Sequence, residues 1–501
     1  MPSGSVSSAW RVAAGGMLCL LAMHGARAAP TVSITGQVPG PTPFVQYVFA
    51  EVGGGTLADV GFSVTPRAGS FTRPVAAYAS AAYLAAHGGL GGSSVIVPVF
   101  GLYAGTTSTV ALSFGFTDGS TTRITLPITT AAYVDPCPEI NAPVITNNRT
   151  ATADLDFDFF ILKDYCSRNA PAVFDTDGQL RGVGFAGVGS FPGELFRNGV
   201  YTSDGGTGVN RLDLYGIVTK IGDYAGAGIT YTNHHNIDVG RHGLVVDVNT
   251  ATDVEADAIE IDGTTGAILN RWDMAAIIGD AMRAGGDDPG GFVHADGATD
   301  WFHMNATAYD PAENALIVSS RQNFVIAVDY DTPADGVKKI HWILGDATKL
   351  WGRFPSLRRY ALTVDAATPV PIGQHAVSID SAGDLLLFND GYGSAGISPP
   401  GISRGYSTAN SYRIDAAART ATGVYAYRPD PSLYSPVCGS AYEVAPSSHL
   451  VDFATAGPYS STTIQGLGAN NRVVFQMQFA VNNTCGSGWN ASPIPSLPVR
   501  Y

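Results

Sequence analysis

Charge is scarce in this 501-residue chain, and positive charge is scarcer than negative charge. Lys and Arg number 28 against 42 Asp and Glu, so the formal net charge is −14 at pH 7. No basic patch interrupts this acidic background, so we expect no nucleic-acid partner. The chain also lacks a G-x-x-x-x-G-K-[ST] loop, the signature that cradles nucleotide phosphates. Hydrophobic residues make up 45% of the chain, a fraction that excludes disorder and supplies large cores.

Long apolar runs are lacking as well, except near the start. Residues 1–28 combine Arg11, the apolar run VAAGGMLCLLAM and the small-residue sequence ARA, and together these predict a cleaved signal peptide. A buried N-terminal helix is the alternative. Cleavage would remove Arg11 and Arg27 and no acid, moving the charge from −14 to −16. No other run reaches the roughly 20 residues of a membrane span. We therefore expect an exported protein, periplasmic or secreted, with no membrane span.

Cysteine is rare, with five in the chain, and Cys19 falls inside the predicted signal peptide. The other four form an even set, which indicates disulfides in an oxidising compartment. Four cysteines allow three pairings. We favour Cys137–Cys166 and Cys438–Cys485, because each pair closes a loop of modest length. The spacing does not resemble that of a zinc site.

Glycine is abundant, with 60 residues, and separates many short alternating stretches. Residues 29–135 contain stretches such as TVSITG and SVIVPVFGLY, which predict a small N-terminal β-sandwich domain. PCPEINAP reads as a linker. Residues 140–501 repeat apolar hairpins such as ATAYDPAENALIVSS, which predict a β-propeller. The fold class is therefore all-β, with one helical insertion expected over residues 274–286.

Three of the hairpins place a histidine where their innermost strand begins. His235 lies in NHHNIDVG, His303 in HMNATAYD and His375 in GQHAVSID, at intervals of 68 and 72 residues. Near-equal intervals predict one such strand per blade. Innermost strands line the central channel of a propeller, so the three imidazoles are expected to converge at one mouth of it.

One hairpin predicts a more detailed cluster. If DPAEN is its turn, His303 falls opposite Arg321 as a cross-strand neighbour. The two-residue period of a strand places Asn305 on the same face as His303. The sequence thus predicts a His–Asn–Arg cluster at one end of one blade.

The side chains of this cluster are suited to binding an anion. Arginine, asparagine and histidine side chains offer donors to a tetrahedral oxyanion, and a further histidine can attack its central atom. Three imidazoles can also hold zinc. Arg321 would repel that cation, and no carboxylate is evident in the first coordination shell. Asp390 could lie opposite His375, which keeps the metal alternative open.

These motifs match a known family. NHHNID, DWFHMN, LIVSSRQN, HWILG and GQHA occur in its order, preceded by VFGLYAG at 99–105, so the chain resembles the bacterial aryl-sulfate sulfotransferases that use no nucleotide donor. The resemblance covers nearly all of the chain after residue 28. One departure is Asn236, where an acidic residue is expected. It puts in doubt a carboxylate that would orient the nearby imidazole.

The resemblance implies a six-bladed propeller with its site in the central channel. It implies transfer of a sulfuryl group from an aryl sulfate to a phenol by a ping-pong route, with no cofactor and no metal. His375 would be the nucleophile that becomes sulfohistidine. His303, Asn305 and Arg321 would bind the sulfuryl oxygens, and His235 would be the acid/base near the phenolic oxygen.

Two other functions fit parts of the pattern. One is a metal-dependent hydrolase on a propeller. The other is a non-enzymatic exported propeller that binds glycans or proteins, with the sandwich as an adhesion module. The exposed edge of the sandwich could also support a homodimer. His449 could begin a further blade, and His234 must point away from His235, so the contribution of both stays open.

Overall fold

The computed structural model describes residues 29–500 except 152–154, 165, 168, 170, 185–192, 214–215, 482–484, 486–487 and 496–498. The predicted signal peptide, residues 1–28, and the side chain of His234 lie outside the described part. Strands dominate it. Among the described residues, no helix is long and apolar enough to cross a membrane.

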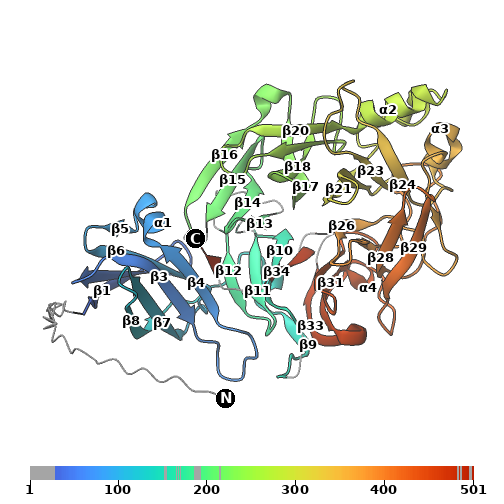
Figure 1. Ribbon diagram of the computed structural model, residues 1–501. Coiled ribbons are helices and arrows are strands. Elements are labelled where there is room, and N and C mark those ends of the chain that lie inside the picture. Colours follow the sequence, from blue (N-terminus) through green and yellow to red (C-terminus); the bar gives the residue numbers. More distant parts are fainter. Residues whose placement is uncertain are drawn as a thin grey trace, which may run out of the picture.

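Two sheets pack face to face in the N-terminal part, shown in blue in Figure 1. The first contains β1 (Thr31–Pro39), β2 (Val45–Gly53), β6 (Ser94–Phe100) and β5 (Leu90–Gly91). The second contains β4 (Val75–Ser80), β3 (Leu57–Val64), β7 (Thr107–Phe116) and β8 (Thr121–Thr129), with β35 (Val499–Arg500) at its edge. The short helix α1 (Ala81–Ala86) follows β4. Along β7, Val110, Leu112 and Phe114 alternate with exposed or half-buried residues, so one face of the strand forms the core.

Six further sheets surround a common centre and make a β-propeller (Figure 1). The first blade has β12 (Leu180–Val183), β11 (Ala172–Asp175), β10 (Phe157–Asp164) and β34 (Trp489–Pro495). The second has β13 (Glu194–Phe196), β14 (Gly199–Ser203), β15 (Gly208–Asp213) and β16 (Val218–Asp223). The third has β17 (Tyr231–Val239), β18 (Leu244–Asn249), β19 (Asp257–Ile261) and β20 (Ile268–Asp273).

The other three blades follow in chain order. The fourth has β21 (Met304–Asp310), β22 (Ala315–Ser320), β23 (Val325–Asp329) and β24 (Ile340–Leu344). The fifth has β26 (His375–Ile379), β27 (Leu385–Asn389), β28 (Thr408–Asp415), β29 (Thr420–Tyr427) and β25 (Thr363–Val364). The sixth has β30 (Ser440–Ala445), β31 (Ser448–Thr455), β32 (Ser461–Gly468), β33 (Arg472–Ala480) and β9 (Val144–Asn147). The predicted all-β propeller is therefore confirmed.

Segments from both ends of the chain close the ring. β34 pairs antiparallel with β10, with Phe159 opposite Ile494, and so becomes the innermost strand of the first blade. β9 pairs with β33 at the outer edge of the sixth blade. β35 then pairs in parallel with β4 of the sandwich. Pairing of this kind covers strand edges that would otherwise stay open. It also interleaves the two units, so the predicted boundary between residues 135 and 140 stays a prediction.

A helical insertion covers the third and fourth blades. The helix α2 (Met274–Ala284) begins at Asp273, whose side chain accepts a hydrogen bond from the N–H of Ala276. Met274, Ile278 and Met282 recur every four residues and are buried against the blade core. The helix predicted over residues 274–286 is confirmed. Two single-turn helices, α3 (Pro355–Arg358) and α4 (Ala456–Tyr459), lie in later connections.

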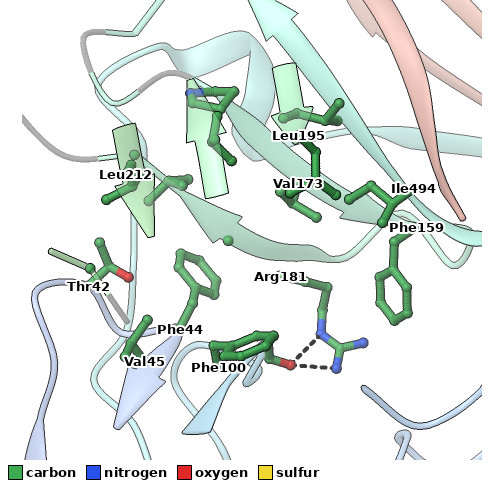
Figure 2. A pocket seen from close by; sticks show the side chains of 18 of the residues that line it. Thr42, Phe44, Val45, Phe100, Phe159, Val173, Arg181, Leu195, Leu212 and Ile494 are labelled. Atoms are coloured by element: carbon green, nitrogen blue, oxygen red, sulfur yellow. Dashed lines mark hydrogen bonds between the residues drawn. The ribbon is translucent and has the colours of Figure 1, made fainter. Parts of the chain in front are cut away.

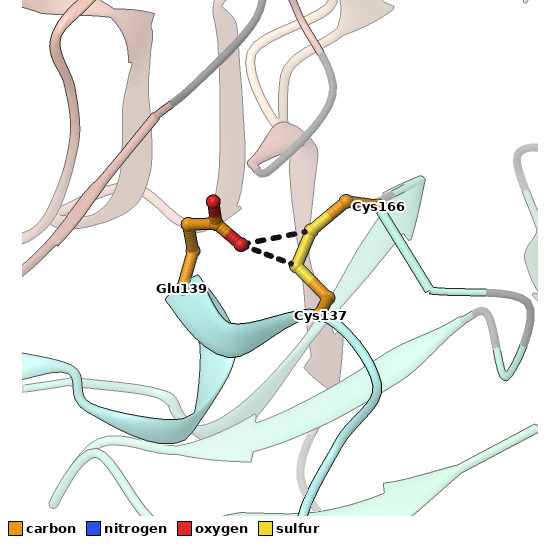
Figure 3. Close-up of side chains that lie close together, drawn as sticks. All are labelled: Cys137, Glu139 and Cys166. Atoms are coloured by element: carbon orange, nitrogen blue, oxygen red, sulfur yellow. Dashed lines mark hydrogen bonds between the residues drawn. A yellow bond between two sulfur atoms is a disulfide. The ribbon is translucent and has the colours of Figure 1, made fainter.

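Both predicted disulfides are present. Cys137 pairs with Cys166, with their Cα atoms 5.4 Å apart, and Cys438 pairs with Cys485 at 5.9 Å. The first bond joins the linker to the segment that follows β10. Glu139 lies beside it, with Oε2 3.2 Å from Sγ of Cys137 and 3.5 Å from Sγ of Cys166 (Figure 3).

Candidate functional site

The three histidines lie on consecutive blades, as the intervals predicted. His235 lies in an irregular stretch of β17, between the pairs Thr232–Val248 and Ile237–Val246. His303 directly precedes β21, and His375 is the first residue of β26. These strands stand at the inner ends of the third, fourth and fifth blades (Figure 1). The structure therefore brings together residues that are far apart in the sequence.

His235 and His303 are in direct contact. Nε2 of His235 lies 3.0 Å from Nε2 of His303, and the ring centroids are 4.7 Å apart. Oε2 of Glu255 lies 3.1 Å from Nε2 of His235 and 3.0 Å from Nδ1 of His303. Oδ2 of Asp300 is 2.9 Å from the same Nδ1. Two imidazoles and two carboxylates thus form one hydrogen-bonded cluster, through which a proton can pass.

The backbone around this cluster is strained. His303, Glu255 and Ala376, the residue after His375, all have positive φ, at 57°, 54° and 53°. Residues with a Cβ seldom adopt this left-handed conformation, which costs of order 1–3 kcal/mol each. The N–H of Met304, the residue after His303, donates to the carbonyl of Glu255 at 2.7 Å, so the two segments that contain His303 and Glu255 are joined. Such strain clusters at functional sites.

His303 carries a positive charge at neutral pH. Burial by itself lowers the pKa of this imidazole, but the hydrogen bonds and charges of Asp300 and Glu255 more than compensate and raise the pKa to about 9. The site therefore contains an imidazolium held by two carboxylates. Its Nε2 faces His235, so the pair can exchange a proton with a bound molecule.

His375 is in the opposite electrostatic state. Its Nδ1 lies 2.7 Å from Oδ2 of Asp390 and 3.0 Å from the carbonyl oxygen of Gly373. A carbonyl can only accept, so Nδ1 carries the hydrogen and Nε2 keeps its lone pair. Burial, together with the charges of Arg321 and His303, lowers the pKa of His375 well below its usual value. His375 is therefore a neutral imidazole, the form that can act as a nucleophile.

The fourth-blade hairpin has the predicted register at its inner end. Met304 pairs with Ser320, and the N–H of Arg321 donates to the carbonyl of His303 at 3.0 Å. A β-bulge at Asn305 shifts the register by one residue, because Ala306 pairs with Ser319. The charge of Arg321 acts on the fifth blade. It adds to burial in lowering the pKa of His375, whereas burial raises the pKa of Asp390 well above its usual value and Arg321 only partly opposes that rise.

Asn305 connects two blades. Its side-chain amide donates to the carbonyl of Gln374 at 2.8 Å, directly before His375. Gln374 in turn donates from Nε2 to the carbonyl of Ser320 at 2.8 Å. The bulge thus helps to fix the position of His375. The amide of Asn305 has a second N–H, which remains able to contact a ligand.

Two carboxylates of the site were not predicted from the sequence. No acidic neighbour was expected for His235 or His303, and Asn236 put in doubt a carboxylate beside the nearby imidazole. The structure supplies Glu255 from the segment before β19, and Asp300 from three residues before His303. Asp300 stands in the DWFHMN motif, so its proximity could have been noticed. No motif or spacing in the sequence connects Glu255 with the histidines. It lies in a connection between strands, where its backbone has a left-handed conformation. The possible contact between Asp390 and His375 is confirmed.

The strand that closes the ring also reaches the site. Trp489 on β34 packs edge-on against His235, with ring centroids 4.7 Å apart. Nδ2 of Asn490 donates to Oδ1 of Asn236 at 3.1 Å. The strand that closes the propeller therefore contacts both His235 and the residue after it. His449 lies apart on β31, stacked on Tyr425 at 4.4 Å.

In the part of the chain that the structure describes, two groups of side chains have the composition of a metal site. His235, Glu255 and His303 each offer a ligand atom, and these atoms lie within 4.8 Å of one another. Their charges and spacing fit a divalent cation once His303 loses its proton. The second group, Cys137, Glu139 and Cys166, does not fit, because its two sulfurs are joined in a disulfide (Figure 3).

A separate apolar cavity of about 140 Å³ lies between the sandwich and the first two blades. Phe44, Phe100, Val173 and Leu212 line it, and Arg181 borders it with its guanidinium bonded to the carbonyl of Gly101 (Figure 2). None of the three histidines contributes to its lining. We place the site at the histidines, because a cavity of this kind offers packing space but no reactive group.

The fold and the site define a class of protein: a β-propeller whose inner strand ends carry a neutral histidine beside a cationic histidine and an arginine. Such a set suits an anion that reacts with an imidazole. The chain belongs to the arylsulfotransferase (ASST) family, whose model matches residues 145–490.

Two curated relatives are named "Arylsulfate sulfotransferase AssT". The protein of Escherichia coli O6:H1 (strain CFT073) is 28% identical over 234 residues, which cover 42% of this chain and 38% of the relative. That of Lelliottia amnigena is 25% identical over 227 residues, covering 40% and 36%. The chain thus matches well under half the length of these relatives. A solved structure of a tandem-repeat region from a large adhesion protein is 11% identical to this chain. The match covers 90% of this chain and 99% of that one, but the TM-score is 0.16, too low to indicate a shared fold.

Proposed function

We propose that this protein is an aryl-sulfate sulfotransferase, which moves a sulfuryl group from a phenolic sulfate ester to a phenol without a nucleotide donor. The observation that carries the proposal is the state of His375. Its Nδ1 hydrogen is held by Asp390 and Gly373, its Nε2 lone pair is available, and two cations, Arg321 and His303, act on it electrostatically. Membership of the arylsulfotransferase family and the names of the two relatives support the same reaction.

In the first half-reaction, Nε2 of His375 attacks the sulfur atom of the donor. The N–S bond forms as the bond between sulfur and the aryl oxygen breaks, and the electron pair leaves with the phenolate. Asp390 stabilises the positive charge that develops on the imidazole. His235, protonated through its contact with His303, gives a proton to the phenolate.

In the second half-reaction, an acceptor phenol replaces the released one. His235 takes its proton, the phenolic oxygen attacks sulfur, and the N–S bond breaks to regenerate neutral His375. The phenol is suited to both steps, because its pKa of about 10 makes it a fair leaving group that needs a base on return. The double displacement therefore proceeds through a sulfohistidine at His375.

Charge stabilisation explains the cations of the site. Sulfuryl transfer, like phosphoryl transfer, is expected to have a loose transition state with charge on three equatorial oxygens. Arg321 and the second N–H of Asn305 are the donors that would face these oxygens. His303, whose two nitrogens contact His235 and the carboxylates, adds positive charge beside them. Donors held in place before the reaction, here by the strained backbone and the carboxylates, are the main catalytic device for such charge.

The predicted signal peptide and the two disulfides fit a protein that is exported and works in the periplasm or outside the cell. Aryl sulfates and phenols are its proposed small-molecule partners. The homodimer through the sandwich edge also stays a proposal.

The test is an assay of the mature chain with 4-nitrophenyl sulfate, with and without phenol and with chelator throughout. We expect release of nitrophenolate that depends on phenol, survives chelation and vanishes in His375→Ala. His449→Ala, a buried histidine away from the cluster, is the matched control and should retain activity. Mass spectrometry should find a sulfuryl group on His375 when the acceptor is omitted. Release that needs metal and ignores phenol would instead support a hydrolase built on His235, Glu255 and His303.

A further inference from the structure

A buried lysine lies behind Arg321 and has no part in the steps above. Lys349 directly precedes the short 3-10 helix Leu350–Arg353, after β24, and is 1% exposed. Its Nζ donates to the carbonyl of Gln322 at 3.1 Å and lies 3.4 Å from the carbonyl of Arg321. A buried ammonium is costly unless it is paired. The ammonium group of Lys349 faces the turn that contains Arg321 of the proposed site.

The surroundings of Lys349 contain few compensating charges. Asp346, the acid that acts on it, accepts from the N–H of Thr348 at 2.9 Å and from that of Ile402 at 2.8 Å. Among the described residues, no ion pair joins Lys349 to a carboxylate. Burial lowers the pKa of Lys349 to about 7, with Asp346 opposing this shift and Arg321 adding to it. The lysine is therefore poised to change its charge near neutral pH.

The turn that Lys349 contacts is held from several directions. The N–H of Arg321 bonds the carbonyl of His303 at 3.0 Å, and Oγ of Ser394 donates to the carbonyl of Gln322. Lys349 adds a charged donor to the same turn. Without it, the carbonyl of Arg321 and the buried carbonyl of Gln322 would each lose a side-chain donor, and the turn would be free to shift.

We propose that Lys349 is a positioning residue for Arg321, which holds the turn through its two carbonyls and adds positive charge behind the anion site. The proposal rests on the proposed function, since a sulfate ester must occupy that site. Lys349 touches no reacting atom. It acts by fixing where the guanidinium stands and by raising the affinity for the anionic group while the amine is protonated.

Binding of inorganic sulfate, measured by calorimetry between pH 6 and 8, tests the proposal. The wild-type chain should bind more weakly as the pH rises through about 7, because the amine loses its charge. Lys349→Met should weaken binding at pH 6 about tenfold, the effect of one charge-assisted hydrogen bond, and should show no such pH dependence. Lys349→Arg should keep its charge and bind equally at both pH values.

The matched control is Lys338→Met in the same blade. Lys338 is also buried, its Nζ donates to a backbone carbonyl, that of Tyr330, at 2.5 Å, and burial lowers its pKa to about 8. This variant should lose thermal stability much as Lys349→Met does, yet bind sulfate like the wild type. In turnover of 4-nitrophenyl sulfate, Lys349→Met should raise KM more than it lowers kcat.

Three outcomes separate the proposals. If the wild type turns over the ester and Lys349→Met matches Lys338→Met in sulfate affinity and pH profile, the lysine is only structural and this inference fails while the proposed function stands. If the wild type binds sulfate but turns over no ester, the proposed function fails and the lysine is judged by sulfate affinity alone. If the wild type binds no sulfate, the anion site itself is refuted.

Discussion

The pair of His375 and Asp390 provides the sharpest test of the proposed nucleophile. We consider Asp390→Asn, which keeps the size of the side chain and removes the carboxyl group that can balance positive charge on the imidazole of His375. The carboxylate accepts from Nδ1 of His375 at 2.7 Å in a fully buried setting. A hydrogen bond to a charged group contributes about 1.5–3 kcal/mol. At about 1.36 kcal/mol per tenfold, its loss from the transition state should slow sulfuryl transfer by about 10- to 150-fold.

The structure also sets an upper limit on this effect. In a serine-protease triad, the equivalent change costs about ten-thousandfold because the amide selects the wrong tautomer. Here the carbonyl of Gly373 accepts from the same Nδ1 at 3.0 Å and can only accept, so it preserves the tautomer. The variant should therefore lose charge stabilisation but keep the orientation of the ring.

The assay is the single-turnover burst of nitrophenolate from 4-nitrophenyl sulfate, which isolates formation of the N–S bond. Asp452→Asn is the matched control. Its carboxyl is equally buried, and burial raises the pKa of both carboxyls well above the usual value. The carboxyl of Asp452 accepts from the backbone N–H of Ala491 at 3.2 Å rather than from an imidazole, so its replacement by an amide should leave the burst rate unchanged. A burst rate for Asp390→Asn within threefold of the wild type would refute the reasoning, and a loss as complete as that of His375→Ala would refute the part assigned to Gly373.

Three further predictions follow from the same geometry. First, kcat/KM should fall as the pH rises through about 9, where His303 loses its proton, and Glu255→Gln should move this limb to lower pH. Second, because the folded pKa of His303 is raised, its contribution to stability is complete below about pH 6.5 and disappears through about pH 9, a loss of about 3 kcal/mol in the free energy of unfolding; chemical denaturation of His303→Gln should lack this slope. Third, the disulfides close loops with sequence separations of 29 and 47 residues. Replacing either cysteine pair by serines should therefore lower the free energy of unfolding by about 3–4 kcal/mol. Equal unfolding midpoints with and without reductant would contradict this.

Much of the site could be predicted because it depends on local spacing. The turn between β21 and β22 is short, so the strand period places Arg321 within one residue of the position opposite His303. The near-equal intervals between the histidines, 68 and 72 residues, follow from repeated blades of similar length. The reach of a cysteine pair is also local, which explains why both disulfides were predicted correctly.

The predicted pairing of His303 with Arg321 is correct because of a feature that the sequence does not show. Regular pairing from the observed turn, where Asp310 pairs with Ala315, would place Arg321 opposite Met304. The bulge at Asn305 shifts the pairing by one residue, and this shift brings Arg321 to His303. It also turns Asn305 toward Gln374, a contact between blades that strand periodicity cannot predict.

By itself, the sequence determined the all-β class, the recurrence of hairpins, the order of the motifs and the composition of the candidate site. These depend on short-range rules of alternation, turn chemistry and spacing. Only the tertiary structure decided which carboxylates serve which histidine, and hence their charges. Glu255 and Lys349 meet their partners across blades or loops, whereas the strand register already suggested Asp390 as the neighbour of His375. The hydrogen bonds and charges of Asp300 and Glu255 make His303 a cation against the effect of burial, while burial leaves His375 neutral, and no local pattern contains that information.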